Sequence, residues 1–415
     1  MNILYVSRAA PNANGKGVER RAAQHLRTLL KLGDVTMVLP AAAAEAARAA
    51  GLDLSRLGLR EVIIRAEPTR AELTQHAYDQ AKAPLARLWR AIQRRYDVDQ
   101  TAQKADAARY AQRLAGRFDL LFAFRISSAV WADSVFGFGA GRPRVSIVDF
   151  DDIESVAMAR NTRDLQASPL WRILVRRYVS DLQNIERRLV RRWTGVCTCS
   201  KADAEVLGAR YGARAHVIPN AVDFTHPLDE TISPEVNLLF VGTFSYAPNV
   251  AGLTWFVDEV WPTLRKALGD RASLSVVGFD PPPEILAMDA VPGVWVFGPV
   301  ADLGEPYRRA NIVIVPIFSG SGTRIKLIEA LAHRRAVVTT TLGCEGLELE
   351  DGRHAAIADT PAAFAVRVME LATDSAARAA MAEAGRGFGQ ERYADPVVAA
   401  ALEAILRREM RLAEG

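Results

Sequence analysis

Short apolar runs alternate with amphipathic stretches from the first residues onward. Residues 2–7 and 34–40 are apolar runs of strand length, and residues 18–32 between them carry a helical pattern. A strand, a helix and a second strand within forty residues predict a βαβ unit, and therefore a parallel sheet. Further strands of the first half are expected at 61–65, 120–124, 144–149 and 195–200.

The second half of the chain repeats this pattern. Strands are expected at 237–241, 273–277, 294–297, 312–315 and 336–340. Because there is no short-period repeat, the two halves predict two Rossmann-like α/β domains, each with a doubly wound parallel sheet. We expect an N-terminal domain at 1–220 and a C-terminal domain at 221–397, facing each other across a cleft. A helix at about 398–415 is expected to pack back on the first domain, and a charged helical insertion is expected at about 70–117.

Composition and length narrow the class of protein further. A chain of 415 residues exceeds one ordinary core. Its three cysteines, Cys197, Cys199 and Cys344, are too few for a disulfide framework, and we expect buried thiols in a reducing cytoplasm. No apolar stretch approaches the roughly 18–20 residues of a membrane span. No His, Cys and carboxylate cluster has metal-ligand spacing, so neither a metal nor another cofactor is expected.

Charge is unevenly distributed along the chain. Residues 1–220 carry 35 Lys and Arg against 22 Asp and Glu, a balance of +13, whereas residues 221–415 carry 17 against 26, a balance of −9. The helical stretch 171–192 is rich in arginine. Its basic face is either simply solvated or docks on anionic lipid head groups at the inner face of the membrane. A nucleic-acid partner is not expected, because no nucleic-acid motif accompanies the charge.

The most informative segment follows the strand expected at 312–315. Gly320 and Gly322 lie in a loop with small side chains, and Thr323 is placed to cap the helix that follows. The free amides and the dipole of a helix start bind anions such as a diphosphate. Arg324 and Lys326 add two cations to this first turn. Cations next to the positive end of the helix dipole cost stability unless an anion is bound there, so the pair indicates a ligand.

The same segment contains a carboxylate one turn farther along. Glu329 follows Lys326 by three residues, so the two side chains share a helix face. This offset suits a carboxylate that binds ribose hydroxyls while the cations bind phosphates. A glycine-rich loop before an ordinary helix, with a solvated basic–acidic pair, is the competing interpretation.

Four segments resemble, in chain order, motifs of the retaining GT-B glycosyltransferases known as family 4. They are residues 196–203, 217–223, 241–249 and 320–347, and the third is similar to a variant found in exopolysaccharide sugar transferases. The resemblance implies a GT-B fold and transfer from a nucleotide-sugar, with UDP- or GDP-sugars as the expected donors and no bound metal.

The resemblance also implies roles for individual residues. Glu329 matches the ribose-binding glutamate, and Arg324 and Lys326 match basic positions at the diphosphate. The backbone of Gly242 and Thr243 is expected to approach that diphosphate from the other side. The remaining donor-binding positions implied by the motif are Gly322, Thr323 and Leu327.

Two departures from the family pattern affect the sugar end of this site. Ser321 stands where the family has its first glutamate, which usually contacts the donor sugar. The turn 243–246 lacks the Arg and Lys of many relatives. Arg324 and Lys326 are expected to take over the cationic role.

A second candidate site is the acidic segment 149–155, directly after the strand expected at 144–149. Asp151 stands where many relatives have a histidine that contacts the transferred sugar, and Asp149 is the alternative alignment. A carboxylate at this position can orient an acceptor hydroxyl or act as a weak base. Capping of the next helix by Asp151 or Asp152, or a magnesium-type carboxylate pair, are the alternatives. Gly15 and Gly17 are expected in an acceptor-side loop, although a plain turn fits equally well.

These observations favour a retaining glycosyltransferase that moves a sugar to a saccharide or lipid-linked saccharide acceptor. Exopolysaccharide or cell-surface glycan assembly is the expected context, with a cytoplasmic protein peripheral to the membrane. A GT-B nucleotide-sugar epimerase or hydrolase, and a non-catalytic nucleotide-sugar-binding partner, are the competing functions.

Overall fold

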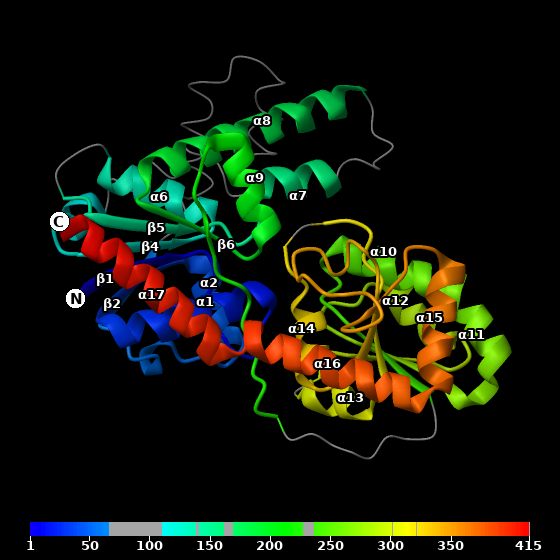
Figure 1. The fold of residues 1–415 in the computed structure, drawn as a ribbon. Coiled ribbons are helices and arrows are strands. Elements are labelled where there is room, and N and C mark those ends of the chain that lie inside the picture. The colour runs from blue at the N-terminus through cyan, green and yellow to red at the C-terminus, as the bar shows by residue number, and fades with distance from the viewer. Residues whose placement is uncertain are drawn as a thin grey trace. The chain divides into compact units, whose positions relative to one another are not determined.

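The computed structural model describes residues 1–65, 110–137, 141–161, 169–226, 236–300, 302–320 and 322–414. These residues form two compact units (Figure 1). Unit 1 comprises Met1–Ile218 together with Ala399–Gly415, and unit 2 comprises Pro219–Val398. Most of the insertion expected at 70–117 lies outside the described residues, as does Ser321.

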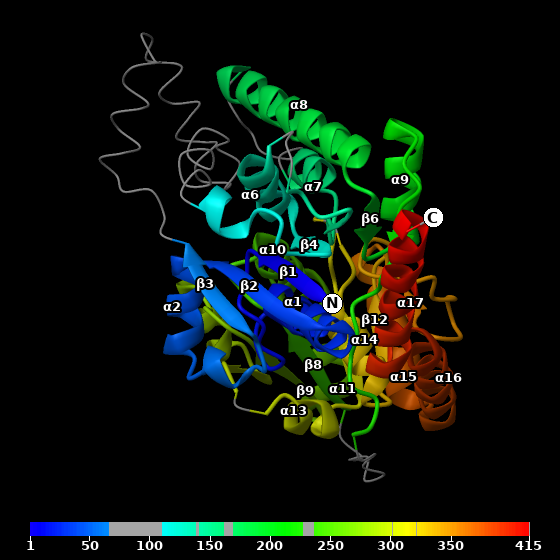
Figure 2. The same ribbon diagram turned by 90° about the vertical axis from the view of Figure 1, so that its left-hand side faces the viewer.

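Unit 1 is built on a seven-stranded sheet in which all described neighbours are parallel. The strand order is β3-β2-β1-β4-β5-β6-β7. Figure 2 shows β3, β2 and β1 side by side in this sheet. Order therefore reverses between β1 and β4, which are hydrogen-bonded neighbours. The strands are β1 (Asn2–Ser7), β2 (Asp34–Pro40), β3 (Glu61–Arg65), β4 (Leu120–Phe124), β5 (Val145–Asp149), β6 (Gly195–Thr198) and β7 (His216–Val217).

The helices of unit 1 connect these strands. Among the described helices of unit 1, α6 is the most apolar; it is buried almost throughout and follows the carboxyl end of β4. The described helices are α1 (Gly17–Leu32), α2 (Ala41–Ala49), η1 (Leu54–Arg56), α6 (Ile126–Phe136), α7 (Glu154–Asn161), α8 (Pro169–Arg192) and α9 (Lys201–Tyr211).

Unit 2 is built on a six-stranded parallel sheet. Its order is β10-β9-β8-β11-β12-β13, so the reversal falls between β8 and β11. In sheets of this kind ligands bind beyond the carboxyl ends of the strands at such a switch point. The strands are β8 (Val236–Val241), β9 (Ala272–Val277), β10 (Val294–Gly298), β11 (Ile312–Val315), β12 (Ala336–Thr339) and β13 (Ala356–Ile357).

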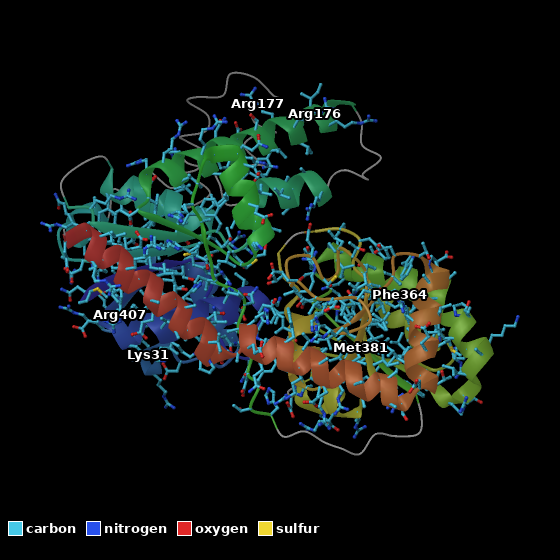
Figure 3. The ribbon with its side chains drawn as sticks, viewed as in Figure 1. Lys31, Arg176, Arg177, Phe364, Met381 and Arg407 are labelled. Carbon is cyan, nitrogen blue, oxygen red and sulfur yellow. The ribbon has the colours of Figure 1, made fainter. Side chains whose placement is uncertain are left out.

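The core of unit 2 gathers apolar residues from the sheet and from α10, α11, α15 and α16, and Phe364 and Met381 mark it in Figure 3. Helix α17 begins in unit 2, and its residues from Ala399 onward belong to unit 1. The helices are α10 (Ala247–Trp255), η2 (Phe256–Val260), α11 (Trp261–Leu268), η3 (Gly269–Arg271), α12 (Pro283–Leu286), η4 (Ala287–Ala290), α13 (Gly304–Arg309), α14 (Ile325–Ala332), α15 (Pro361–Thr373), α16 (Ser375–Tyr393) and α17 (Asp395–Glu414).

The periodicity predicted the long strands to within two residues and missed two very short ones. Strands β7 and β13 have two residues each, too few for a periodic signal. The three cysteines are free and buried, as expected. Among the residues that the structure describes, no helix is long and apolar enough to span a membrane.

Candidate functional site

The switch point of unit 2 brings two loops together. The turn 242–246 follows β8, and the residues described in 316–320 and 322–324 follow β11. A Cβ built on Gly252 of α10 would lie 1.8 Å from the Pro316 carbonyl oxygen, so only glycine allows this approach. Gly320 has φ +97°, and a Cβ there would lie 1.9 Å from the Tyr246 hydroxyl. The two loops are therefore in direct contact, held by positions that require glycine.

The start of α14 differs from the prediction. The helix begins at Ile325 with Arg324 at the N-cap position, and no side chain caps it. The expectation that Thr323 caps this helix is wrong. Its hydroxyl instead accepts a hydrogen bond from the Asn220 side chain at 2.8 Å. The helix start thus keeps amides that a Thr cap would have occupied.

Two cations lie at this helix start. Arg324 is buried, and one of its guanidinium nitrogens donates to the Gly322 carbonyl at 2.5 Å. The Lys326 ammonium donates to the Asn249 side-chain oxygen at 2.7 Å and lies 4.5 Å from the centre of the Phe240 ring. Burial and the nearby Arg324 lower the pKa of Lys326 to about 7, against a smaller opposing effect of Glu329. A bound anion would restore the full charge of this lysine.

Asn249 links the two loops, although its role could not be predicted from the sequence. Its amide nitrogen donates to the Thr243 carbonyl at 2.8 Å, while its side-chain oxygen accepts from Lys326. It is buried at the start of α10. Its place at the end of the motif 241–249 was the available signal.

Glu329 is buried and held by an aromatic partner. The Tyr307 hydroxyl lies 3.1 Å from a Glu329 carboxylate oxygen and 3.2 Å from the Lys326 carbonyl. The Tyr307 ring stacks on His333, with centroids 4.7 Å apart. Burial, together with His226 and nearby arginines, lowers the pKa of His333 to about 4, so its ring is neutral at pH 7. The hydrogen bond from Tyr307 fixes the direction of the Glu329 carboxylate, which can accept further hydrogen bonds.

The remaining donor-side positions have mainly structural contacts. Leu327 is fully buried in the core of unit 2. The Gly242 amide donates to the Val277 carbonyl at 3.0 Å, and a Cβ on Gly242 would lie 3.0 Å from the Asn249 side-chain nitrogen. Gly322 has φ +76°, a left-handed conformation that favours glycine. These residues shape the loops around Arg324 and Lys326.

In unit 1, Asp149 at the end of β5 is fully buried. Its carboxylate accepts two hydrogen bonds from Arg21, at 2.8 and 3.0 Å, and lies 2.7 Å from His25 Nε2. Burial alone would raise the pKa of Asp149, but Arg21 and His25 outweigh it and hold the pKa well below its usual range. Asp149 also accepts from the backbone amide of Asp151 at 2.9 Å, so it supports the turn that follows β5.

Asp151 is the more accessible of the two candidate carboxylates. Its φ is +62°, and Arg125 at the end of β4 has φ +75°, both unusual for residues other than glycine. Arg125 contacts Asp151 at 3.1 Å and also pairs with Asp152. Burial raises the pKa of Asp151 to about 6; Arg125 and Arg21 oppose this, and Asp152 and Asp149 add to it. Strained backbone of this kind is typical of functional positions.

Helix capping by Asp151 or Asp152 and metal binding are the alternative roles of the acidic segment. Helix α7 begins at Glu154, and both Asp151 and Asp152 contact Arg125. Within the described residues, no group of three His, Cys, Asp or Glu is arranged to hold a metal ion.

The loop after β1 forms a locally capped turn. Glu19 accepts a hydrogen bond from the Lys16 amide at 2.9 Å, and α1 begins at Gly17. A Cβ on Gly15 would lie 1.9 Å from a Glu19 carboxylate oxygen. A side chain at position 15 would therefore displace the Glu19 carboxylate, and the acceptor-side role of Gly15 and Gly17 remains an expectation.

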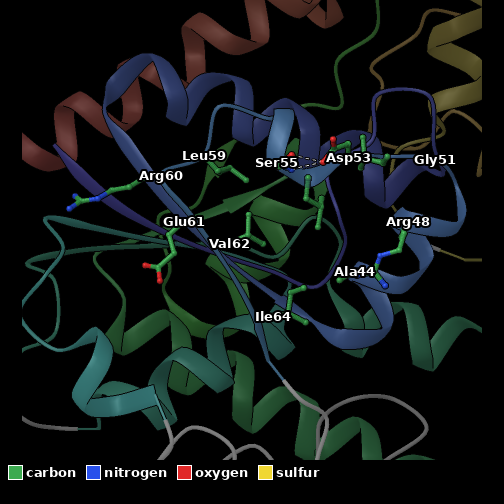
Figure 4. Close-up of a pocket in the computed structure, with 12 residues that line it drawn as sticks. Ala44, Arg48, Gly51, Asp53, Ser55, Leu59, Arg60, Glu61, Val62 and Ile64 are labelled. Carbon is green, nitrogen blue, oxygen red and sulfur yellow. Dashed lines mark hydrogen bonds between the residues drawn. The ribbon is translucent and has the colours of Figure 1, made fainter.

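Unit 1 also has a hollow of about 650 Å³ beside its edge strand β3 (Figure 4). Residues of α2, η1 and β3 line it, including Arg48 and Glu61. Asp53 at its rim accepts hydrogen bonds from the Ser55 amide and hydroxyl at 3.0 and 2.6 Å. None of the predicted site residues lines this hollow.

Two parallel sheets with these strand orders define the GT-B class of α/β fold, and solved structures agree. Anabaena Alr3699/HepE in complex with UDP has a TM-score of 0.65 at 13% identity, covering 98% of this chain and 100% of that one. Thermosynechococcus elongatus sucrose-phosphate synthase has a TM-score of 0.67 at 15% identity, covering 98% of both chains. WaaG, a glycosyltransferase involved in lipopolysaccharide biosynthesis, has a TM-score of 0.65 at 13% identity, covering 98% of this chain and 99% of that one.

Sequence comparison finds similarity over part of the chain. Residues 235–374 match the family model described as "Glycosyl transferases group 1". An uncharacterized 44.6 kDa protein in the cps region of Klebsiella pneumoniae is 24% identical over 186 residues, which span 42% of this chain and 48% of that protein. The match thus spans about half the length of this curated relative. The matched domain and the GT-B fold together indicate a glycosyltransferase.

Proposed function

We propose that this glycosyltransferase moves a sugar, with retention of anomeric configuration, from a UDP- or GDP-sugar to a saccharide or lipid-linked saccharide. The observation that carries the proposal is the pair of cations, Arg324 and Lys326, at the start of α14 beside the switch point of unit 2. Such a position binds a diphosphate through helix amides, the helix dipole and charge together. The UDP and UDP-glucose complexes of HepE, a protein of the same fold, support the choice of donor.

The diphosphate gains negative charge as the bond to the sugar breaks. Preorganised donors and cations around the departing group stabilise this charge more in the transition state than in the ground state. Arg324 is permanently charged, whereas Lys326, with a pKa near 7, becomes fully charged when the phosphates arrive. We assign both residues to leaving-group stabilisation, and no metal or other cofactor enters the proposal.

At the nucleotide end, we assign Glu329 to the ribose hydroxyls. A carboxylate that already accepts from Tyr307 has a fixed orientation and further acceptor capacity for a diol. Leu327, Gly242, Thr243, Gly322 and Thr323 complete the proposed donor site as loop and core positions.

On the acceptor side, we assign Asp151 and not Asp149 to the substrate. Asp149 is buried and paired with Arg21, so its proposed role is to position the turn that carries Asp151. Asp151, with a pKa of about 6, is largely ionised at pH 7 and can orient an acceptor hydroxyl or weakly accept its proton. Attack and departure on the same face of the sugar then give retention.

For the cellular context, we propose glycan assembly at the inner face of the membrane. The exposed face of α8 carries Arg172, Arg176, Arg177, Arg187 and Arg191, and Ile173 is 61% exposed beside them. Arg176 and Arg177 project from the helix in Figure 3. No Asp or Glu belongs to the exposed positions among the described side chains of α8. This combination suits anionic lipid head groups.

Vesicle sedimentation tests the membrane proposal. We expect binding to phosphatidylcholine vesicles that contain about one third phosphatidylglycerol, weakening with salt because the attraction is screened. Arg176→Glu with Arg187→Glu should abolish it. Equal binding to neutral vesicles, or unchanged binding of the double variant, would count against this role for α8.

A thermal-shift panel of UDP, GDP, ADP and TDP, followed by the sugars of the nucleotide that binds, tests the transfer activity. Product analysis by mass spectrometry and NMR then separates three outcomes. An acceptor-dependent glycoside with retained configuration supports the proposal. Free sugar or its epimer without acceptor dependence indicates an epimerase or hydrolase. Binding without turnover under any acceptor indicates a non-catalytic partner.

A further inference from the structure

We propose that Asn249 is a positioning residue that sets both the place and the charge of Lys326 at the diphosphate. The inference rests on the proposed function of the same site. It goes further because it makes nucleotide binding depend on an uncharged amide in α10.

The geometry gives Asn249 two simultaneous tasks. Its nitrogen donates to the Thr243 carbonyl of the turn after β8, at 2.8 Å, and its oxygen accepts from the Lys326 ammonium of α14, at 2.7 Å. Its own backbone amide donates to the Tyr246 carbonyl at 2.9 Å, which fixes it in the same turn. A side-chain amide can donate through its nitrogen and accept through its oxygen at the same time. The two loops of the switch point are thus joined through one buried side chain.

The surroundings explain why the partner of Lys326 is an amide and not a carboxylate. The Phe240 ring packs against the ammonium at 4.5 Å. Arg324, at the N-cap position of α14, lowers the pKa of Lys326, and Glu329, within α14, raises it. A carboxylate at 249 would form an ion pair and cancel the charge needed by the phosphates. A neutral acceptor holds the ammonium in place and leaves its charge for the ligand.

This arrangement predicts that binding of the diphosphate is coupled to proton uptake. With the pKa of Lys326 near 7, the free protein increasingly loses this cation above pH 7, whereas the complex retains it. Affinity for UDP should therefore fall as pH rises from 7 to 9. If the anion holds the lysine charged throughout, the fall is roughly fiftyfold, by the relation between pKa and binding.

The experiment is calorimetry of UDP and uridine, with GDP and guanosine in parallel, at pH 7, 8 and 9. In Asn249→Asp, the new carboxylate keeps Lys326 protonated, so UDP affinity at pH 7 should fall about tenfold and its pH dependence should shrink to less than threefold. Asn249→Ala, which removes the contact without adding charge, should weaken UDP but not uridine. Uridine lacks phosphates and reports on nucleoside binding alone.

Asn311→Ala is the matched control. Asn311 is equally buried in unit 2, and it accepts from the Asn237 amide at 2.6 Å, just before β11. This variant should lower the melting temperature and leave the pH dependence of UDP affinity as in the wild type. Folding of every variant is checked by circular dichroism.

The outcomes separate the inference from the proposed function. If the wild-type protein binds UDP or GDP but Asn249→Asp retains its affinity and pH dependence, the positioning role is wrong and the proposed function stands. If neither nucleotide binds the wild-type protein, both the proposed function and the inference are wrong. Equal losses of UDP and uridine in Asn249→Ala would also overturn the inference, because a merely structural role affects both ligands.

Discussion

Replacing Arg21 by methionine should destabilise unit 1 strongly without touching the proposed donor site. Arg21 and Asp149 have completely buried side chains and share two charge-assisted hydrogen bonds, at 2.8 and 3.0 Å. Arg21 also donates to the Ile218 carbonyl at 2.8 Å. Removing one partner of a buried pair leaves an uncompensated charge and costs about 3–5 kcal/mol. Unit 1 consists of two segments of 218 and 17 residues, 235 in total. For a unit of this size, the loss in unfolding free energy corresponds to a fall of about 6–20 °C in melting temperature.

The pH dependence of this variant has a definite sign. In the wild type, the folded-state pKa of Asp149 is depressed, so its contribution is present above the unfolded pKa near 3.8 and is lost as pH falls. In Arg21→Met, the buried Asp149–His25 pair retains one extra proton, so stability falls as pH rises through the raised pKa. The difference in unfolding free energy between wild type and variant should therefore be smaller at pH 5 than at pH 8.

Urea unfolding at pH 5, 7 and 8, followed by circular dichroism, measures both effects. Arg176→Met, at an exposed position of α8, is the control and should change the unfolding free energy by no more than about 0.5 kcal/mol. Adding Asp149→Asn to Arg21→Met should recover part of the loss, because the unpaired charge is removed. A loss below about 1 kcal/mol in the single variant, or an opposite pH trend, would refute this account of the buried pair.

Three further predictions concern the proposed site. In calorimetry, Glu329→Ala should weaken UDP binding by about ten- to a hundredfold, because it removes a charged acceptor. Tyr307→Phe should weaken it by less than tenfold, because it removes only the donor that orients this acceptor. Unchanged affinity for Glu329→Ala would exclude the ribose role. Arg324→Ala with Lys326→Ala should lower kcat at least about a hundredfold and affect folding less than turnover, and a normal rate would contradict leaving-group stabilisation. The wild-type kcat/KM should fall as pH drops below about 6, and Asp151→Asn should remove this limb; a limb that persists in the variant assigns it to another group.

The boundaries of the strands and the α/β class follow from local patterns in the sequence. Alternating apolar runs and amphipathic helices predict a parallel sheet because each element buries a face that its own residues define. The loop and helix at 320–332 were recognisable for the same reason, since glycines, two cations and a carboxylate lie within ten residues. Strands β7 and β13 could not be predicted from the sequence, because pairing in the sheet, and not a pattern in their own two residues, defines them.

The roles of the two carboxylates and of Asn249 were decided only by the tertiary structure. Asp149 and Asp151 look alike in the sequence, but Asp149 is fully buried and accepts two hydrogen bonds from Arg21, 128 residues away. Asp151 is partly exposed and lies 3.4 Å from the same guanidinium. Asn249 and Lys326 are 77 positions apart and meet because β8 and β11 are neighbours in the sheet. Thr323 does not cap α14, because the helix begins at Ile325 and the Thr323 hydroxyl accepts a hydrogen bond from Asn220, 103 positions away. Local composition thus determined which elements and which charged segments exist. Strand order and packing determined which side chains meet, because burial and pairing depend on residues that are distant in the chain.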